Sequence, residues 1–83
     1  MSSVGEILSH FKPTKTPQAV NLDYRDITSI GIVDPIFHKI KELSLNHNKI
    51  SSLQGIQQFK RLRVLKLNFN KIKSQMELLK VTG

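Results

Sequence analysis

The sequence predicts an α/β solenoid, a chain that coils into stacked turns with one short strand in each coil. The first observation is a repeated string, which runs Leu43-x-Leu45-x-x-Asn48-x-Ile50 and returns as Leu65-x-Leu67-x-x-Asn70-x-Ile72, displaced by 22 residues. A period of about 20 to 29 residues, with aliphatics alternating around a fixed asparagine, is typical of such coils. The second observation is the size. A chain of 83 residues with 39% hydrophobic residues suits one small ordered domain with a thin core.

The two motif copies resemble those of leucine-rich repeat proteins, specifically the 22-residue class typified by the regulatory subunit of type-1 protein phosphatase. The resemblance covers residues 20–81 and implies parallel strands that line a concave face. Members of this class serve as phosphatase regulators, axonemal dynein light chains, tubulin-folding factors and centrosomal or ciliary scaffolds.

Residues 1–19 are predicted to form a capping helix and a connector. Ser3-x-x-Glu6 has the spacing of a capping box, and four apolar residues follow at helical spacing: Val4, Ile7, Leu8 and Phe11. We therefore expect an amphipathic helix over residues 3–12 that covers the first coil, because an uncovered solenoid end would expose its core. A docking helix for another protein is the alternative. Pro13 and Pro17 bracket the connector.

The first coil, residues 20–42, reads Val20-x-Leu22-x-x-Arg25-x-Ile27-x-x-Ile30 and has Arg25 where the later coils have asparagine. It is one residue longer than the second coil. Matching Ile36 with Phe59 and Ile40 with Leu62 places the extra residue between Ile36 and Ile40. Asp34-Pro35 is expected to begin a short helix through both isoleucines, with Asp34 as its N-cap.

The second coil, residues 43–64, is the most regular, with Gly55 expected at a turn. The third coil, residues 65–83, begins equally well and then departs from the pattern: Gln75 replaces Leu53 and Glu77 replaces Gly55, whereas Leu78 and Val81 still match Ile56 and Phe59. We expect an open edge at this end, and therefore the N-terminal fragment of a larger protein or self-association through that edge.

The asparagines of the motif are predicted to be structural. Asn48 and Asn70 follow the strands, where a buried amide can donate to and accept from the backbone. The resemblance implies that they form an internal ladder. Arg25 cannot accept a hydrogen bond, so the ladder is in doubt in the first coil and Arg25 is expected to point outward.

Side chains that alternate with the buried leucines should face the concave surface. Aligning the coils gives three columns: Asn21 with Ser44 and Lys66, Asp23 with Asn46 and Asn68, and Tyr24 with His47 and Phe69. The ring column is either a strip for binding a partner, since exposed aromatics among polar groups are typical of interfaces, or rings that pack on one another at the coil edge. Both interpretations remain open at this point.

No enzymatic motif is recognisable. Ser44, His47 and Asp23 include the residue types of a nucleophilic triad, but Ser44 and His47 share one strand with no pocket or oxyanion donor predicted beside them. His10, His38 and His47 fall in different elements without metal-ligand spacing. The chain has no cysteine. We therefore expect no enzyme, no cofactor and no metal site.

The net charge of +7 is concentrated in the second half: residues 1–38 carry −1, from three Lys/Arg and four Asp/Glu, and residues 39–83 carry +8, from ten and two. A basic half can attract acidic protein tails, phosphoinositides or nucleic acid. The alternative is that lysine is the usual occupant of exposed solenoid corners, and the single spacing of the charges favours this interpretation. The nucleic-acid alternative would use Arg61, Arg63, Lys66, Lys71 and Lys73, with a leucine-rich spliceosomal subunit as the precedent that the resemblance offers.

The favoured hypothesis is a protein-binding module that uses the concave face and belongs to a centrosomal or axonemal scaffold. A phosphatase-regulator-like adaptor, a nucleic-acid-associated subunit and a structural homo-oligomer are the alternatives. The first residues lack the pattern of a signal peptide, and no apolar run is long enough to span a bilayer. We expect an intracellular location, in the cytoplasm or on the cytoskeleton, with the nucleus still open.

Overall fold

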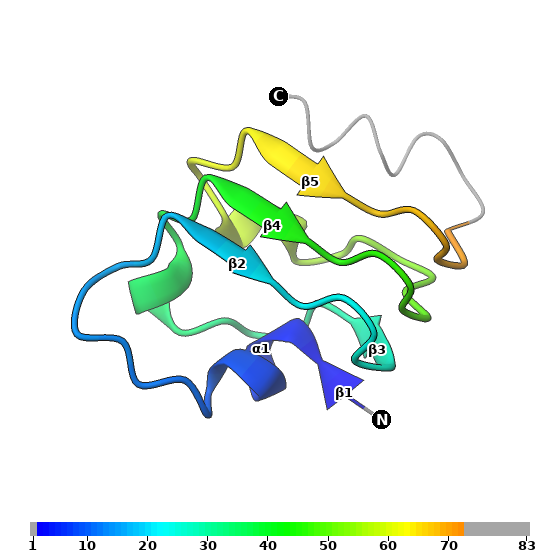
Figure 1. Ribbon diagram of the computed structural model, residues 1–83, viewed down its shortest axis with the longest axis horizontal. Coiled ribbons are helices and arrows are strands. Elements are labelled where there is room, and N and C mark those ends of the chain that lie inside the picture. Colours follow the sequence, from blue (N-terminus) through cyan, green and yellow to red (C-terminus); the bar gives the residue numbers. More distant parts are fainter. Residues whose placement is uncertain (1, 73–83) are drawn as a thin grey trace.

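The computed structural model describes residues 2–72, which wind through successive coils stacked side by side (Figure 1). Three parallel strands form one sheet in the order β2-β4-β5, with the bounds Ala19–Asn21, Glu42–Ser44 and Val64–Lys66. A second sheet pairs β1 (Ser2–Ser3) in parallel with β3 (Ile27–Ser29). Parallel strands in small sheets, separated by turns and short helices, make an α/β repeat fold.

The register of the main sheet follows the repeat. Val20 lies opposite Leu43, which lies opposite Leu65, and Asn21, Ser44 and Lys66 form the next row. Successive side chains of a strand point to opposite faces, so the first row faces the core and the second faces the concave surface. The alignment expected from the sequence is confirmed for these strands.

The N-terminal helix is shorter than expected. Helix α1 spans Val4–Leu8 instead of residues 3–12, and the side chain of Ser3 caps it by accepting a hydrogen bond from the Glu6 N–H at 3.0 Å. After Leu8 the chain tightens into turns, in which the His10 N–H donates to Ile7 O at 3.1 Å and the Phe11 N–H donates to Leu8 O at 2.9 Å. Pro13 disfavours helical backbone at Lys12, the residue before it. Phe11 consequently lies outside the helix. Its ring packs edge to face against the ring of Phe37, with a distance of 6.3 Å between the ring centroids.

Helix α1 lies against the first coil at very short range. Val4 and Leu8 are completely buried, and the Gly5 N–H donates to the Ile30 carbonyl at 2.9 Å. A Cβ atom on Gly5 would lie 1.9 Å from the carbonyl oxygen of Ile32, which is far inside van der Waals contact. The absence of a side chain at residue 5 is therefore what allows this approach.

The back of the first two coils carries short 3-10 helices, η1 (Pro35–Phe37) and η2 (Ile56–Gln58). Asp34 caps η1 as expected, because its side chain accepts from the Ile36 N–H at 3.0 Å. Gly55, expected at a turn, precedes η2 with a φ of 100°. The predicted helix through Ile36 and Ile40 is thus only three residues long.

The expected equivalence of Ile36 with Phe59 is wrong. Phe37 is 2% exposed and Phe59 is 4% exposed, whereas Ile36 is 36% exposed. Three residues lie between Val33 and Phe37, whereas two lie between their equivalents Ile56 and Phe59. The extra residue of the first coil therefore lies before Phe37 and not between Ile36 and Ile40. Helix η2 begins at Ile56, the equivalent of Val33, whereas the Asp34 cap makes η1 begin at Pro35, two residues after Val33. Ile36 consequently lies on the outer side of this turn.

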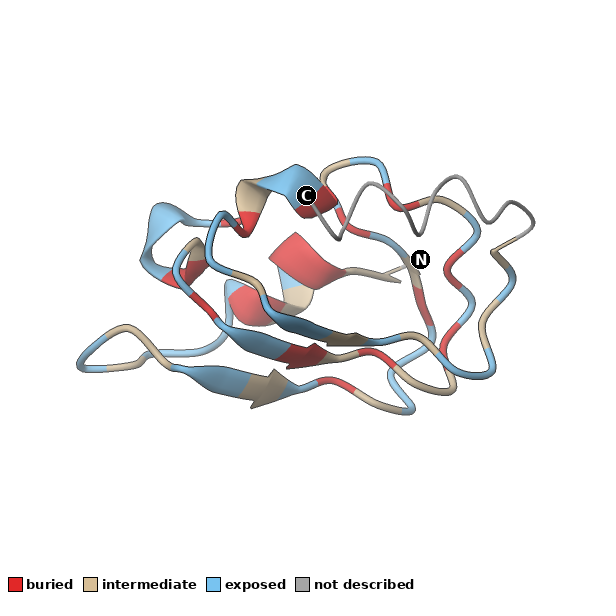
Figure 2. Ribbon diagram, turned by 90° about the horizontal axis from the view of Figure 1, so that it is seen from above, coloured by how far each residue is buried: buried red, intermediate tan, exposed pale blue. Residues whose placement is uncertain are grey.

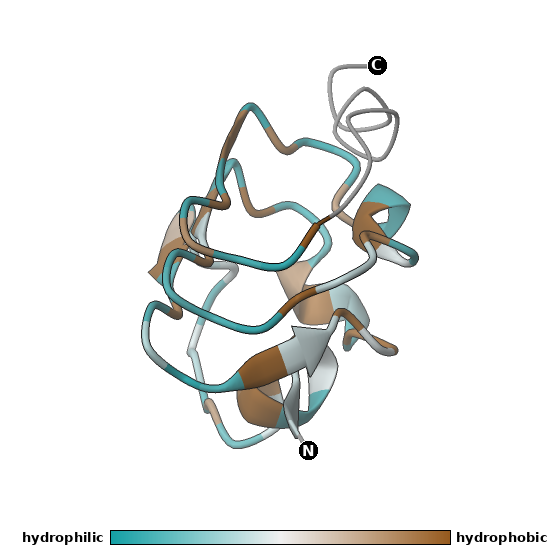
Figure 3. Cartoon of the chain, turned by 90° about the vertical axis from the view of Figure 1, so that its right-hand side faces the viewer, coloured by the Kyte–Doolittle hydropathy of each residue, from teal (hydrophilic) through white to brown (hydrophobic). Residues whose placement is uncertain are grey.

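The core runs between the sheet and the backs of the coils, as the buried residues in Figure 2 show. Figure 3 shows the coils stacked from the N-terminal end upward. Fully buried apolar residues recur at equivalent positions of the first two coils, for example Leu22 with Leu45 and Ile27 with Ile50. Their third-coil equivalents, Leu67 and Ile72, are half-buried.

The third-coil assignments at Gln75, Glu77, Leu78 and Val81 lie outside the described residues. Within residues 2–72, no helix is long and apolar enough to cross a membrane.

The corrected alignment can be tested with two alanine variants. Phe37→Ala should lower the free energy of unfolding by about 3 to 5 kcal/mol, because it leaves a cavity in the core. Ile36→Ala, one residue away and partly exposed, should lower it by less than about 1 kcal/mol. Urea denaturation followed by circular dichroism measures both. A larger loss for Ile36→Ala would restore the original alignment.

Candidate functional site

The most exposed rings of the sheet form a stack at the end where the chain leaves the strands. The His47 ring lies between the rings of Tyr24 and Phe69, with centroid distances of 4.3 Å on both sides and interplanar angles of 7° and 10°. Tyr24 and Phe69 are each 73% exposed. These three residues are called the aromatic stack below. Neighbouring strands lie about 4.8 Å apart, so any column of rings in equivalent positions comes within stacking distance.

The backbone holds the aromatic stack in an unusual conformation. Tyr24, His47 and Phe69 all have positive φ, at 59°, 57° and 62°. For residues other than glycine the left-handed region costs about 1 to 2 kcal/mol each. Hydrogen bonds to the next coil hold the first two in place: the Tyr24 N–H donates to Asn46 O at 3.2 Å and the His47 N–H donates to Asn68 O at 2.8 Å. The sequence offered no signal for this conformation.

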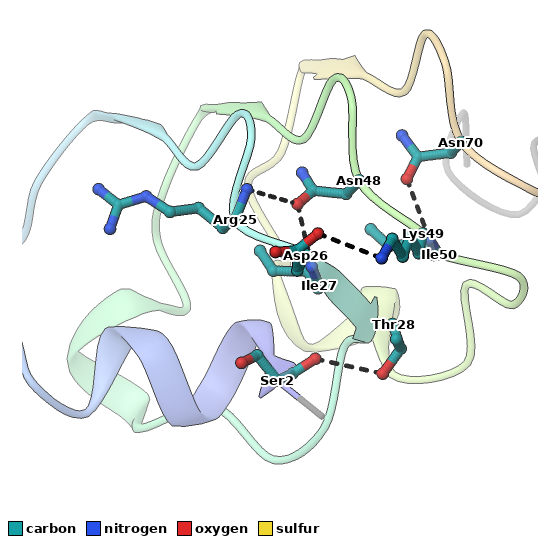
Figure 4. A network of polar contacts seen from close by, with 9 residues as sticks. All are labelled: Ser2, Arg25, Asp26, Ile27, Thr28, Asn48, Lys49, Ile50 and Asn70. Atoms are coloured by element: carbon teal, nitrogen blue, oxygen red, sulfur yellow. Dashed lines mark hydrogen bonds and ion pairs between the residues drawn. The ribbon is translucent and has the colours of Figure 1, made fainter.

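Asn48 joins the first two coils through a set of buried hydrogen bonds (Figure 4). Its Oδ1 accepts from the N–H groups of Arg25 at 2.9 Å and Ile27 at 3.0 Å. Its Nδ2 donates to the carbonyls of Leu22 and Leu45, both at 3.0 Å. Asn48 is 6% exposed, and each of these backbone groups would be costly to leave unpaired.

Asn70 repeats this arrangement between the second and third coils. Its Oδ1 accepts from the Ile50 N–H at 3.0 Å, and its Nδ2 donates to Leu45 O at 2.7 Å and Leu67 O at 3.2 Å. Each asparagine therefore serves the backbone of the coil before its own. The first coil contacts α1 and β1 on its other side. Arg25 contributes only its backbone N–H to the ladder, and its side chain is exposed, as expected.

A second ladder, which the sequence did not reveal, runs in the opposite direction. One oxygen of Asp23 accepts from the Ser44 hydroxyl at 2.6 Å and from the Asn46 N–H at 2.8 Å. In the next coil Asn46 Oδ1 accepts from the Asn68 N–H at 2.8 Å. Each of these side chains serves the coil after its own. The signal that could have found them is the column Asp23, Asn46, Asn68, in which every member has a short side chain with an acceptor oxygen.

The residues with the types of a catalytic triad separate into two groups. The Ser44 hydroxyl donates a hydrogen bond to the Asp23 carboxylate, whereas the His47 ring lies between the rings of Tyr24 and Phe69. The hydroxyl and the imidazole are thus engaged in different contacts. No group of three or more His, Asp or Glu side chains that could hold a metal ion occurs within residues 2–72.

Between the strands the concave surface is a shallow hollow of about 280 Å³. It is lined by the expected row of Asn21, Ser44 and Lys66 and also by Ala19, Glu42 and Val64, which lie in register one pleat earlier. Sequence reasoning missed this second row, although strand alternation two residues before Asn21 would have given it.

The four cations of the nucleic-acid hypothesis that fall within residues 2–72 do not share one face. Arg61 and Arg63 lie in the turn that enters β5, Lys66 ends that strand on the concave side, and Lys71 lies in the turn that follows. Lys73 lies outside the described residues. The turns that enter the strands and those that leave them are at opposite ends of the sheet (Figure 1), so Arg63 and Lys71 are separated by its full length.

Comparison with known families identifies the repeat. A family model described as leucine-rich repeats, in two copies, matches residues 38–80, just over half of the chain. The chain belongs to the leucine-rich repeat family. No curated protein and no solved structure matched it. Leucine-rich repeats are protein-interaction modules without enzymatic activity of their own, so the family implies that this leucine-rich repeat chain has protein partners.

The Asn48 ladder leads to a stability prediction. Asn48→Ala should lower the free energy of unfolding by about 3 kcal/mol or more, because several buried backbone groups lose their partners at once. Asn68→Ala, at an exposed position, should cost less than about 1 kcal/mol. Thermal and urea unfolding of the two variants make the comparison, and equal losses would contradict a special role for Asn48.

Proposed function

We propose that this leucine-rich repeat chain binds a protein partner through its concave face, with the aromatic stack as the main contact. The observation that carries the proposal is the exposure of Tyr24 and Phe69, each 73% exposed although aromatic rings gain most from burial. Such rings are enriched among the residues that dominate binding energy at interfaces.

Rigidity of the aromatic stack supports the same proposal. The rings are ordered by mutual stacking and by the coil-to-coil hydrogen bonds beneath them. A partner would therefore not have to restrain them, and this lowers the entropic cost of binding. Asp23, Ser44, Asn46, Asn68 and Lys66 lie beside the rings and would supply the polar rim.

The narrower assignments form part of this proposal. The resemblance to centrosomal and axonemal scaffolds favours a cytoskeletal partner, in the cytoplasm or on the cytoskeleton, over a phosphatase-regulator-like role. The 22-residue class and the status of a fragment from a larger scaffold are proposed on the same resemblance. A fluorescently tagged chain should accumulate at centrosomes or axonemes. A purely nuclear signal would count against this location.

Substitution of the outer rings tests the binding face. Tyr24→Ala combined with Phe69→Ala should weaken capture of the partner by several hundredfold, since two hot-spot residues at about 2 kcal/mol each contribute about 4 kcal/mol together. Ile32→Ala is the matched control, because Ile32 is an exposed apolar residue, at 93%, outside the concave face. The partner would be identified by photo-crosslinking from position 24 or 69 and its affinity measured with purified proteins.

Partner affinity unchanged by the double substitution would refute the concave-face proposal. Sedimentation of the unmodified chain is measured alongside, because a stable mass above that of the monomer would identify the partner as a second copy. Such self-association is the outcome expected if the edge beyond β5 pairs with itself.

We also infer that residues 1–19 act as a cap on the repeats of residues 20–83. The support is the complete burial of Val4 and Leu8 and the bond from Gly5 to Ile30. A docking helix would present these side chains to a partner.

Gly5→Ala tests the cap, because the added methyl group collides with the Ile32 carbonyl oxygen. It should lower the free energy of unfolding by about 2 kcal/mol or more, whereas helix propensity alone would make the change stabilising by about 1 kcal/mol. Urea denaturation gives the sign of the effect, and a stabilised variant would sink the inference.

A further inference from the structure

Five exposed cations gather at the end of the sheet opposite the aromatic stack. They are contributed by the segments that lead from η1 into β4 and from η2 into β5, and they are called the basic rim: Lys39, Lys41, Lys60, Arg61 and Arg63. The nucleic-acid hypothesis drawn from the sequence includes only Arg61 and Arg63 of these five residues, and only the coiling of the chain brings all five together.

The two coils place these charges in register. Lys39 and Lys41 precede Arg61 and Arg63 by 22 residues. The Arg63 N–H donates to Lys41 O at 2.8 Å, and the Lys60 N–H donates to His38 O at 3.1 Å. Because stacked strands are about 4.8 Å apart, the basic rim is a two-tier array of like charges.

The cations of the basic rim have no acidic partner among residues 2–72. The ion pair that the described residues form, between Lys49 Nζ and Asp26 at 3.4 Å, lies at the other end of the strands. Like charges placed opposite each other on neighbouring strands repel, and the repulsion is relieved when a ligand of opposite charge binds. The rim therefore favours a negatively charged ligand.

An apolar hollow adjoins the basic rim. It measures about 440 Å³, and its lining is mostly apolar, with Phe11, Pro13, Pro17 and Phe37 beside Lys12 and Asn21. Gln18 links the two surfaces, because it follows Pro17 in the chain and its carbonyl accepts from the N–H groups of Lys41 and Glu42 at 2.9 and 3.1 Å.

This combination favours a peptide over a nucleic acid. Single-stranded nucleic acids use exposed rings as stacking platforms beside a basic track. The stacked rings Tyr24 and Phe69 follow β2 and β5, whereas the basic rim precedes β4 and β5, so the two lie at opposite ends of the strands. A hollow lined by prolines and ring edges accepts aliphatic side chains, and the cations beside it accept carboxylates.

We propose that the basic rim and the adjoining hollow bind an acidic peptide segment that carries apolar side chains. The site is separate from the aromatic stack, so a partner could occupy either surface without the other. The proposal consequently does not rest on the concave-face function.

The experiment measures fluorescence anisotropy of a short labelled peptide of repeated Glu-Glu-Leu with the whole chain, at about 0.1 M salt, where charges still interact over about 10 Å. Three further probes are a Gln-Gln-Leu peptide, a Glu-Glu-Gly peptide and an oligouridine RNA of equal charge. The variants are K41Q/R63Q on the rim and K49Q/K71Q at the opposite end. Both lower the net charge from +7 to +5, so they separate a local site from overall charge.

The Glu-Glu-Leu peptide should bind, and K41Q/R63Q should weaken it about tenfold, as expected for the loss of two exposed ion pairs. K49Q/K71Q should change its affinity less than about twofold. The Gln-Gln-Leu and Glu-Glu-Gly peptides should both bind more weakly than Glu-Glu-Leu. The comparison of probes needs no substitution and holds whether or not a variant folds.

Three results would overturn the proposal: no binding of the Glu-Glu-Leu peptide, equal weakening by the two double variants, or RNA binding at least as tight as that of the peptide. Equal affinity for Glu-Glu-Leu and Glu-Glu-Gly would remove the hollow from the site. None of these results bears on Tyr24→Ala and Phe69→Ala, so failure here is distinguishable from failure of the concave-face proposal.

Discussion

The hydrogen bonds of Asn48 hold the first two coils together, and most of the architecture depends on them. One amide pairs backbone groups from both coils at the point where each chain segment leaves its strand. Because these backbone groups are buried, they would lack hydrogen-bond partners without the Asn48 amide, and leaving them unpaired would destabilise the fold. The amide also fixes the turn. Asn70 applies the same constraint to the next coil.

The aromatic stack is a consequence of this turn. Each ring residue directly precedes the position of the ladder, and the backbone there is left-handed. The second ladder runs from Asp23 to Asn46 to Asn68, the residues that directly precede the three rings, and it joins the coils on the concave side. Opposite directions in the two ladders mean that each coil both supports and is supported by its neighbour. Asp23 and Asn46 are therefore structural as well as exposed to the concave face, and a loss of binding on their substitution has to be compared with any loss of stability.

The strands separate two kinds of surface chemistry. The aromatic stack lies where the chain leaves the sheet, beside charges of both signs such as the Lys49–Asp26 ion pair, whereas the basic rim lies where the chain enters the sheet. A repeat fold produces this separation naturally, because every coil contributes to the same edge at the same point of its turn. The strands that lie between keep the two surfaces apart, and a larger partner could contact both.

Although it did not predict the pairing of β1 with β3, the sequence by itself determined the three strands of the main sheet, their register, most of the core and the positions of the two ladder asparagines. These features follow from a pattern that returns every 22 residues, and stacking converts equal positions in the repeat into neighbours in space. It also identified the ring column, although without its exposure or its backbone conformation. The repeat pattern could not show that Phe37, and not Ile36, is buried in the core. Both residues are apolar, and a shift of one residue in a short turn decides which of them is buried.

Only the tertiary structure decided the contacts that do not repeat. The approach of Gly5 to the Ile32 carbonyl, the edge contact of Phe11 with Phe37 and the apolar hollow beside the basic rim all involve the N-terminal segment. That segment has no equivalent elsewhere in the chain, so no periodicity constrains it. Its position is set by the shapes of the surfaces that meet, and those exist only once the coils have formed.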